Sequence, residues 1–541
     1  MNTRTDRRIR IGAGIIAALL ALGFLLGGIL VLLVATDQAP DVVALLGDPY
    51  VRSILGFTLT QAGLSTLFSV ILAIPLALAL HRARFPGKRP ILRLFLLPQA
   101  LPVLVGALAV ITIWGRNGIV SDALAFLGLP RLEVYGLSGI LIAHVFFNMP
   151  LAARLFVAAL DRIPAERWKL SGQLALPPLT VLATVEWPAL RTALPGAAAL
   201  VFMLCVTSFT IVLVLGGGPA ATTLEVAVYQ ALRYDFDPGR AIGLSAIQIV
   251  LTALVLLSTF LLGRDPAGGF GTGAAARRFD AQSPVRAGFD GLVVLCGTLF
   301  VASPFAAILV SGLAADLYRL AGDAAVLEAA LTSLCVAGAA ASLSVVLSAL
   351  VLMAIEALRF GDRKGPVRRS LRIGLETATS LVLVVSPVIV GAGWFLLLRN
   401  VTDVLAAAPY VVVATNAVMA MPFIVRIVGP ALSEASDETG RLAESLGLAG
   451  LARLAFVDWP AMRRPLALAF AFALALSFGD LGAIALFGSN DFVTLPYLLL
   501  QRMGSYRSAD AAGLALILAL ITIVLMGFVE RGFAGRREAG T

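Results

Sequence analysis

Long apolar stretches recur along the whole chain and are separated by short polar ones. Apolar runs of about 20 residues or more are long enough to cross roughly 30 Å of hydrocarbon as helices. Several of these runs contain Gly or Pro, which membrane helices tolerate better than soluble helices do. The pattern predicts an all-α integral membrane protein with twelve spans. They lie at about 11–35, 54–80, 95–114, 137–159, 194–216, 241–263, 289–313, 327–355, 378–398, 407–428, 465–487 and 511–530.

The positions of Lys and Arg predict which side of the membrane each loop occupies. With a cytoplasmic N-terminus, both tails and the even-numbered loops hold 32 of the 41 basic residues, and the opposite loops hold 9. An excess of this kind is typical of cytoplasmic loops. We therefore expect both termini in the cytoplasm. The net charge of +9 is explained by topology and gives no reason to expect nucleic acid as a partner.

One polar segment occurs twice in the sequence. Residues 149–191 align without a gap with residues 421–463, which lie 272 positions later, and seventeen positions are identical. Apolar spans resemble one another because few residue types fill them, so a repeated polar loop is the stronger sign of duplication. The repeat predicts two parallel halves of six spans each. Their expected limits are 1–263 and 289–541, with a Gly/Ala-rich cytoplasmic linker at 264–288.

The sequence lacks the residues that the commonest chemistries need. The only Gly-Lys pair is Gly87-Lys88, and Arg89 follows it, so no P-loop is present. A G-x-S-G pattern ends at Gly139 and resembles that of intramembrane serine proteases. However, His144 lies six residues after Ser138, roughly 9 Å along the same helix, which is too far for a base. We expect no enzymatic activity, no metal site and no cofactor bound by this chain.

The repeated segment contains a short helix with one narrow apolar face. Leu170 and Leu174 are spaced i,i+4, and Leu442 and Leu446 repeat this spacing. Pro164 in the first copy, and Ser436-Asp437 in the second, are suitable helix starts. A helix this short is unstable alone and is expected to dock on something. Capping of the bundle is the simpler alternative, which the identical spacing of two copies disfavours.

These residues resemble a motif of importer-type permeases of ATP-binding-cassette (ABC) transporters. Their cytoplasmic loop reads E-A-A-x(3)-G-x(9)-I-x-L-P. Its Gly position falls here on Ala175 and Gly447, and its proline on Pro188 and Pro460. The motif glutamate falls on Lys169 and Arg441, so a salt bridge inferred from that glutamate does not carry over.

The resemblance implies a type I ABC importer permease of the MetI-like fold, in which this loop is a coupling helix seated in a cleft of an ATPase subunit. It also implies two copies of a separate ATPase, which uses ATP, and a periplasmic binding protein that delivers substrate. The implied coupling residues are Glu166, Lys169, Leu170, Leu174, Ala175, Trp187, Pro188, Glu438, Arg441, Leu442, Leu446, Gly447, Trp459 and Pro460.

A narrower resemblance covers most of the chain. Segments such as Leu215-Gly-Gly-Gly-Pro219 and Tyr234-Asp-Phe-Asp-Pro238 follow the fifth span, and Gly479-Asp480-Leu-Gly482 lies toward the end of the eleventh. They look like the fused permeases of bacterial thiamine and thiamine pyrophosphate importers, which reside in the inner membrane. Fused ferric-iron importer permeases share the same plan and remain an alternative. A secondary transporter of the 6+6 type is the alternative from a different class.

Asp480 is the one acidic residue well inside an expected span. An ionisable group at that depth is costly and usually faces a cavity or a partner. We hypothesise that Asp480 offers negative charge to a cationic substrate, with Phe209 or Phe478 available for stacking on its ring. The alternative is that Asp480 pairs with a neighbouring helix or caps a break at Gly479 or Gly482.

Overall fold

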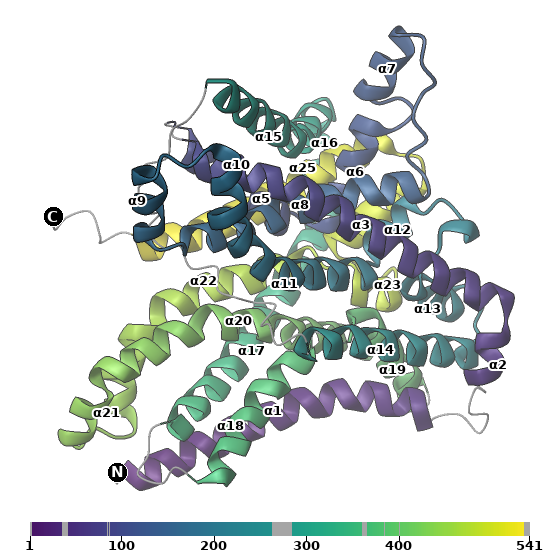
Figure 1. Cartoon of the computed structure of the whole chain (residues 1–541). Coiled ribbons are helices and arrows are strands. Elements are labelled where there is room, and N and C mark those ends of the chain that lie inside the picture. The colour runs from purple at the N-terminus through teal and green to yellow at the C-terminus, as the bar shows by residue number, and fades with distance from the viewer. Residues whose placement is uncertain are drawn as a thin grey trace. The chain divides into compact units, whose positions relative to one another are not determined.

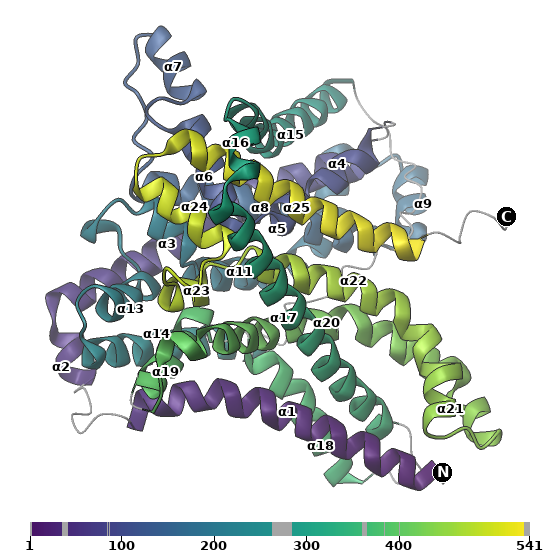
Figure 2. The same cartoon turned by 180° about the vertical axis from the view of Figure 1, so that it is seen from behind.

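Apolar helices make up nearly all of the computed structural model (Figures 1 and 2). It describes residues 3–34, 42–83, 85, 87–261, 284–359, 365–382, 385–399 and 401–534. Within these ranges there is no β-strand, and eleven helices are long and apolar enough to cross a membrane. Residues 264–283 of the expected linker lie outside the described residues. The prediction of an all-α membrane protein is confirmed.

The chain forms two compact units, and each contains segments from both predicted halves of the sequence. One unit comprises residues Met1–Asp41, Val228–Ala246 and Asp316–Thr541, and the other comprises Val42–Ala227 and Ile247–Ala315. The units therefore divide the chain differently from the repeat, because the first helix of each sequence half belongs with the other half. The limits of the two duplicated halves, at 1–263 and 289–541, therefore remain a prediction from the sequence.

The unit of Val42–Ala227 and Ile247–Ala315 is built around the long helix α3, which packs against α8 and α11. Helix α15, the first of the second sequence half, packs on α3 and α6 of this unit. The elements are α2 (Val42–Gly47), α3 (Pro49–Arg82), α4 (Lys88–Leu94), α5 (Leu97–Ala100), α6 (Val103–Trp114), α7 (Ile119–Phe126), α8 (Leu137–Asp161), α9 (Ala165–Gln173), α10 (Pro178–Val181), a π-helical turn (Leu182–Glu186), α11 (Trp187–Val206), α12 (Thr210–Leu215), a 3₁₀ turn (Pro219–Ala221) and α15 (Pro284–Leu313). Helices α13 (Leu224–Arg233) and α14 (Pro238–Leu261) are shared between the units.

The other unit is built around α17, which packs against α20 and α22. Helix α1, the first of the chain, runs along α17 and α19 of this unit (Figures 1 and 2). The elements are α1 (Thr3–Val34), α16 (Leu317–Gly322), α17 (Ala324–Arg359), α18 (Pro366–Leu381), α19 (Pro387–Arg399), α20 (Val404–Ser445), α21 (Leu451–Arg453), a π-helical turn (Leu454–Asp458), α22 (Trp459–Phe478), α23 (Gly482–Phe487), α24 (Leu495–Gly504) and α25 (Ser508–Ala534).

Four expected spans are not single long helices in the structure, namely 95–114, 194–216, 378–398 and 465–487. The prediction for 378–398 is wrong, because α18 ends at Leu381 and a separate α19 begins at Pro387. Proline cannot donate a backbone hydrogen bond, and it disfavours helical geometry in the residue before it. The expected span 95–114 is interrupted in the same way, since Leu101 is extended before Pro102 and α6 begins at Val103.

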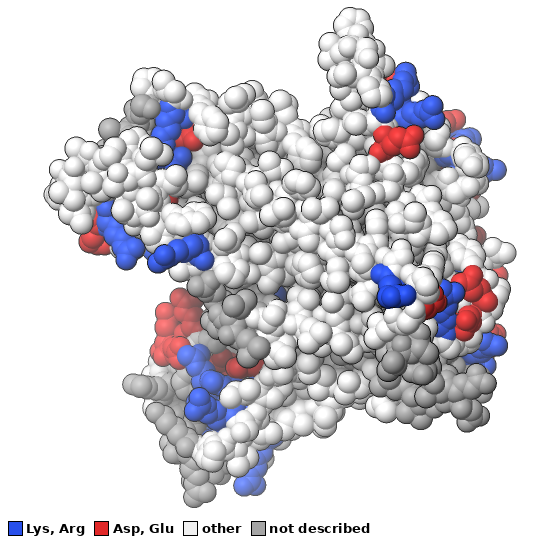
Figure 3. Space-filling view, turned by 45° about the vertical axis from the view of Figure 1, so that its right-hand side comes forward, with Lys and Arg blue, Asp and Glu red and all other residues white. Residues whose placement is uncertain are grey.

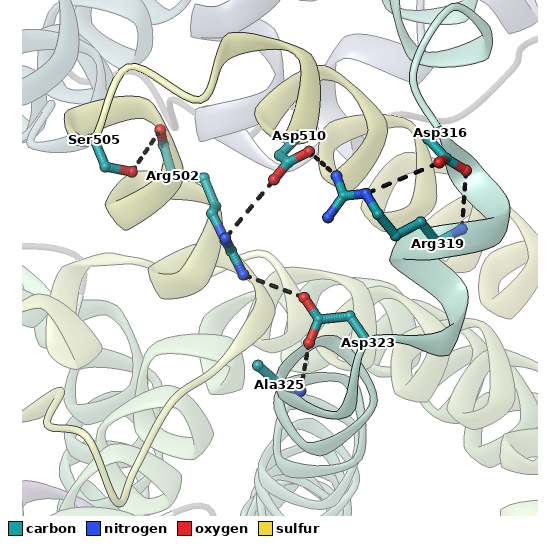
Figure 4. A network of polar contacts seen from close by, with 7 residues as sticks. All are labelled: Asp316, Arg319, Asp323, Ala325, Arg502, Ser505 and Asp510. Atoms are coloured by element: carbon teal, nitrogen blue, oxygen red, sulfur yellow. Dashed lines mark hydrogen bonds and ion pairs between the residues drawn. The ribbon is translucent and has the colours of Figure 1, made fainter.

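The ends of four helices in the α1-containing unit are joined by ion pairs (Figure 4). Arg502 of α24 lies between Asp323, 3.3 Å away at the start of α17, and Asp510, 3.7 Å away in the first turn of α25. Arg319 of α16 also contacts Asp510, and its backbone N–H donates to the Asp316 carboxylate. The carboxylates at the starts of α17 and α25 suit the helix dipoles, so the network fixes where these helices begin.

Most of the described surface in the view of Figure 3 carries no charge. In Figure 3 the Lys, Arg, Asp and Glu side chains gather in a few groups, and wide areas between these groups are uncharged. Large apolar side chains are exposed along the long helices, for example Leu67 and Ile71 on α3 and Leu292 and Leu295 on α15. An apolar surface of this extent suits a hydrocarbon environment.

Candidate functional site: the two repeated loops

The repeated loops, defined here as residues 164–188 and 436–460, differ in how they begin. In the first loop α8 ends at Asp161, and α9 begins after Pro164, whose extended backbone precedes the first turn. In the second loop the expected start at Ser436-Asp437 is wrong, because α20 continues without a break to Ser445. No proline stands at the equivalent position, and Ala, Ser and Glu let the helix continue.

Trp168 anchors the helix of the first loop. Its side chain is fully buried, and its ring lies 5.6 Å from the imidazole of His81 on α3. The equivalent position of the second loop is Gly440. The two loops therefore attach to their units by different means, a buried indole in one and a continuous helix in the other.

Both loops leave their helix through the same turn. The backbone is left-handed at Ala175, with φ of 46°, and at Gly447, with φ of 65°. The N–H of Leu176 donates to the carbonyl of Ser171 at 3.1 Å, and the N–H of Leu448 donates to that of Ala443 at 2.9 Å. This closing pattern needs a residue that accepts positive φ, which explains the glycine of the motif. Ala175 adopts the same conformation at a cost of about 1–2 kcal/mol.

Each loop ends in a π-helical turn directly before the Trp-Pro pair. The turns span Leu182–Glu186 and Leu454–Asp458, exactly equivalent in the repeat, and each wide turn closes on the backbone N–H of the following tryptophan. Single π-turns inside helices often mark functional positions. In both copies the last residue of the turn is a buried acid, whereas Trp187 and Trp459 are exposed.

The same apolar side chains stand exposed on both loops. They are Leu170, Leu174 and Leu179 in the first copy and Leu442, Leu446 and Leu451 in the second, and each is more than half exposed. Glu166, Lys169 and Glu438 are exposed beside them, and the Arg441 side chain lies outside the described residues. Exposed leucines gathered on one surface are typical of sites that contact another protein or the membrane.

The buried acids were not identified from the sequence. Glu186 accepts hydrogen bonds from Arg82 Nε at 3.0 Å and Arg82 Nη2 at 2.5 Å. Asp458 accepts one from Arg10 Nη1 at 2.6 Å. An acidic residue directly before Trp-Pro in both copies is the sequence signal that could have found them.

The residues expected along a substrate pathway lie in different units. Phe209 is buried at the start of α12 in one unit, and Phe478 is buried at the end of α22 in the other. Asp480, two residues after Phe478, accepts hydrogen bonds from the backbone N–H groups of Gly482 at 3.1 Å and Ala483 at 3.4 Å. Its carboxylate thus caps the short helix α23, which is the alternative raised from the sequence. A role toward substrate stays a prediction.

The G-x-S-G segment has no catalytic arrangement. Ser138 Oγ donates to the backbone carbonyl of Glu133 at 2.6 Å. His144 Nδ1 lies 2.9 Å from Ser65 Oγ, inside the bundle. The serine and the histidine therefore have separate partners.

Comparison with known proteins identifies the chain's family. It is 51% identical over 496 residues to the thiamine transport system permease protein ThiP of Brucella abortus (strain 2308), which covers 91% of this chain and 90% of that protein. The chain belongs to the thiamine transport system permease family. ThiP of Escherichia coli (strain K12) is 40% identical over 494 residues, or 91% of each chain. No protein-family model matches.

More distant similarities cover less of the chain. The molybdenum transport system permease protein ModB of Mycobacterium bovis is 28% identical over 218 residues, which is 40% of this chain and 82% of that protein. A crystal structure of a bacterial ABC transporter that imports the acidic polysaccharide alginate is similar with a TM-score of 0.38 and 17% identity, over 41% of this chain and 82% of that chain. Membership of the ThiP family confirms the predicted class, a permease rather than an enzyme.

Proposed function

We propose that this chain forms the transmembrane pathway of an ABC importer for thiamine and its phosphates. The family supports this substrate, because permeases named for thiamine transport are 36–51% identical over about nine tenths of the chain. None of these near full-length relatives is named for ferric iron or for ion-coupled transport, so neither alternative is favoured.

The repeated loops bind two copies of a separate ATPase subunit, one at each loop. The observation that carries this proposal is the duplicated surface: a left-handed turn, a π-turn and exposed leucines recur at the same 272-residue spacing. Burying these leucines in a partner's cleft removes apolar surface from water, which stabilises the complex. This accounts for leucines that stand exposed on both loops. ATP is consumed in the partner, since this chain has no P-loop.

The orientation follows from the basic residues. Both termini and both loops lie in the cytoplasm of a bacterium, and the chain spans its inner membrane, because the loops and tails on that side hold 32 of 41 basic residues. A periplasmic binding protein delivers substrate at the opposite face. Closure of the ATPase pair then moves the units between outward and inward access.

Co-purification with an ABC ATPase subunit from the same organism, followed by hydrolysis measurements, tests the proposal. With the matching binding protein present, we expect thiamine or thiamine pyrophosphate to stimulate ATP hydrolysis by the membrane-embedded complex, and ferric iron to leave it unchanged. Stimulation by iron alone, or failure of the chain to retain any ATPase, would overturn the proposal.

A further inference from the structure

Glu186 and Asp458 occupy one equivalent position in the two halves. Each is the last residue of a π-turn, directly before Trp187 or Trp459, and they are 272 residues apart. Glu186 has no exposed surface, and Asp458 is 2% exposed. A carboxylate buried this deeply is stable only when cations or donors surround it. The cations that surround each carboxylate therefore indicate what the acid does in the structure.

In the unit that contains α1, the partner of Asp458 comes from the N-terminal helix. Arg10 Nη1 donates to the Asp458 carboxylate at 2.6 Å, and Arg10 Nε lies 3.0 Å from Asp6 one turn earlier on α1. Arg453, at the start of the same π-turn, stands 3.8 Å from Asp458. This ion pair thus joins the end of the second loop to α1, which is far away in the sequence.

In the other unit, Glu186 has a corresponding partner on α15. Arg286, near the start of α15, lies 3.7 Å from Glu186. Arg82 at the end of α3 binds Glu186 through two nitrogens and also reaches Asp290 of α15 at 3.5 Å. The acid of the first loop therefore connects two helices, and one of them again opens a sequence half.

Helices α1 and α15 each open one predicted half of the sequence, and Arg10 and Arg286 both lie in the first third of their helix. Each packs in the unit formed mainly by the other half of the sequence. Each acid–arginine contact thus joins the coupling loop of one half to the first helix of the other half. The contact thus gives the end of each loop a direct polar connection to that helix, beside the packing of the helix on its other neighbours.

We propose that Glu186 and Asp458 are positioning residues that lock each coupling loop to the helix contributed by the opposite half. Each unit then moves as one body when the ATPase pulls on its loop. The inference rests on the proposed function, because it requires the loops to receive that movement. Folding stability alone does not explain acids at these two positions, because buried ion pairs can often be replaced by apolar residues without loss of stability.

The test uses the full complex of permease, ATPase and binding protein in proteoliposomes, and measures thiamine imported per ATP hydrolysed. Glu186→Gln and Asp458→Asn should lower this ratio by about fivefold or more, the lower end of typical coupling effects. The amount of ATPase retained should stay the same. Glu376→Gln is the matched control, because Glu376 forms an exposed pair with Arg372 at 3.6 Å on α18 of the same unit, outside the repeated loops, and its ratio should not change.

A second variant keeps the inference testable if Asp458→Asn assembles poorly. Arg10→Cys with Asp458→Cys, in a chain whose own cysteines at 205, 296 and 335 are Ala, allows a bifunctional thiol spacer to replace the ion pair. The coupling ratio should be low before cross-linking and should recover after it.

Three outcomes are distinguishable. An unchanged ratio in both single variants, or a cross-linked double variant that stays uncoupled, would overturn the lock while leaving the thiamine importer intact. A wild-type complex that neither retains ATPase nor imports thiamine would instead overturn the proposed function. A low ratio that recovers with the spacer supports the lock.

Discussion

Replacing the exposed leucines at the coupling turns should weaken the ATPase complex without harming the permease. Leu174 is 60% exposed and Leu446 is 66% exposed, and each stands directly before the left-handed residue of its turn. Because so little of either side chain packs within its own unit, Leu174→Ala and Leu446→Ala should leave thermal unfolding of the detergent-solubilised chain nearly unchanged.

The expected loss of affinity follows from the exposed fraction. Fully burying a leucine is worth about 1.5–3 kcal/mol, so burying the remaining three fifths at an interface contributes about 0.9–1.8 kcal/mol. At room temperature this corresponds to a dissociation constant that is about 5- to 20-fold larger at each loop. Because both loops engage one ATPase pair, the double variant should lose more than either single variant.

The assay is equilibrium binding of the purified ATPase to the permease in nanodiscs. Leu127→Ala is the matched control, since Leu127 is 70% exposed but lies after α7, away from both loops. The control should bind as the wild type does. Equal affinity for all variants, or an equal loss in the control, would refute the reasoning that the repeated loops form the ATPase contact.

Three further predictions concern single residues. Gly447→Ala should destabilise the chain by about 1–2 kcal/mol in thermal unfolding, because its φ is 65° and no atom lies within 4 Å of the added Cβ, so the cost is conformational alone; an unchanged melting temperature would contradict this. Asp480→Asn retains an acceptor for the N–H groups that Asp480 binds, so stability should change by less than about 1 kcal/mol while the KM for thiamine uptake rises. An unchanged KM would leave Asp480 with capping alone. Asp510→Asn should lower stability by about 1–2 kcal/mol, because Arg502 loses one of its two partly buried acids (Figure 4), and full stability would show that Asp323 suffices.

The sequence predicted the features that depend on local chemistry. Spans such as α3 and α17 follow from length and hydropathy, because hydrocarbon allows few alternatives to an apolar helix. The positive φ at Ala175 and Gly447 was not predicted, although the glycine position of the motif is the signal that could have indicated it. The start of α19 at Pro387 could not have been placed from proline alone, because Pro75 and Pro150 lie inside continuous helices of the same chain.

Other features depend on contacts between distant segments, which no local pattern encodes. Helices α1 and α15 carry the same kind of apolar sequence as their neighbours, so hydropathy does not say which unit each one joins. For the same reason the sequence shows Arg10 only as one of the basic residues of the N-terminal tail, although it binds Asp458. Asp480 was singled out by its depth, but its capping of α23 required the backbone to be known.

Uptake of radiolabelled thiamine into proteoliposomes tests the central claim most directly. The vesicles contain the chain with its ATPase and ATP inside, and the binding protein is added outside. We predict accumulation of thiamine that needs ATP, the ATPase and the binding protein together, and that falls when both coupling leucines are replaced. Uptake by the chain alone, driven by a proton or sodium gradient and indifferent to ATP, would contradict the account.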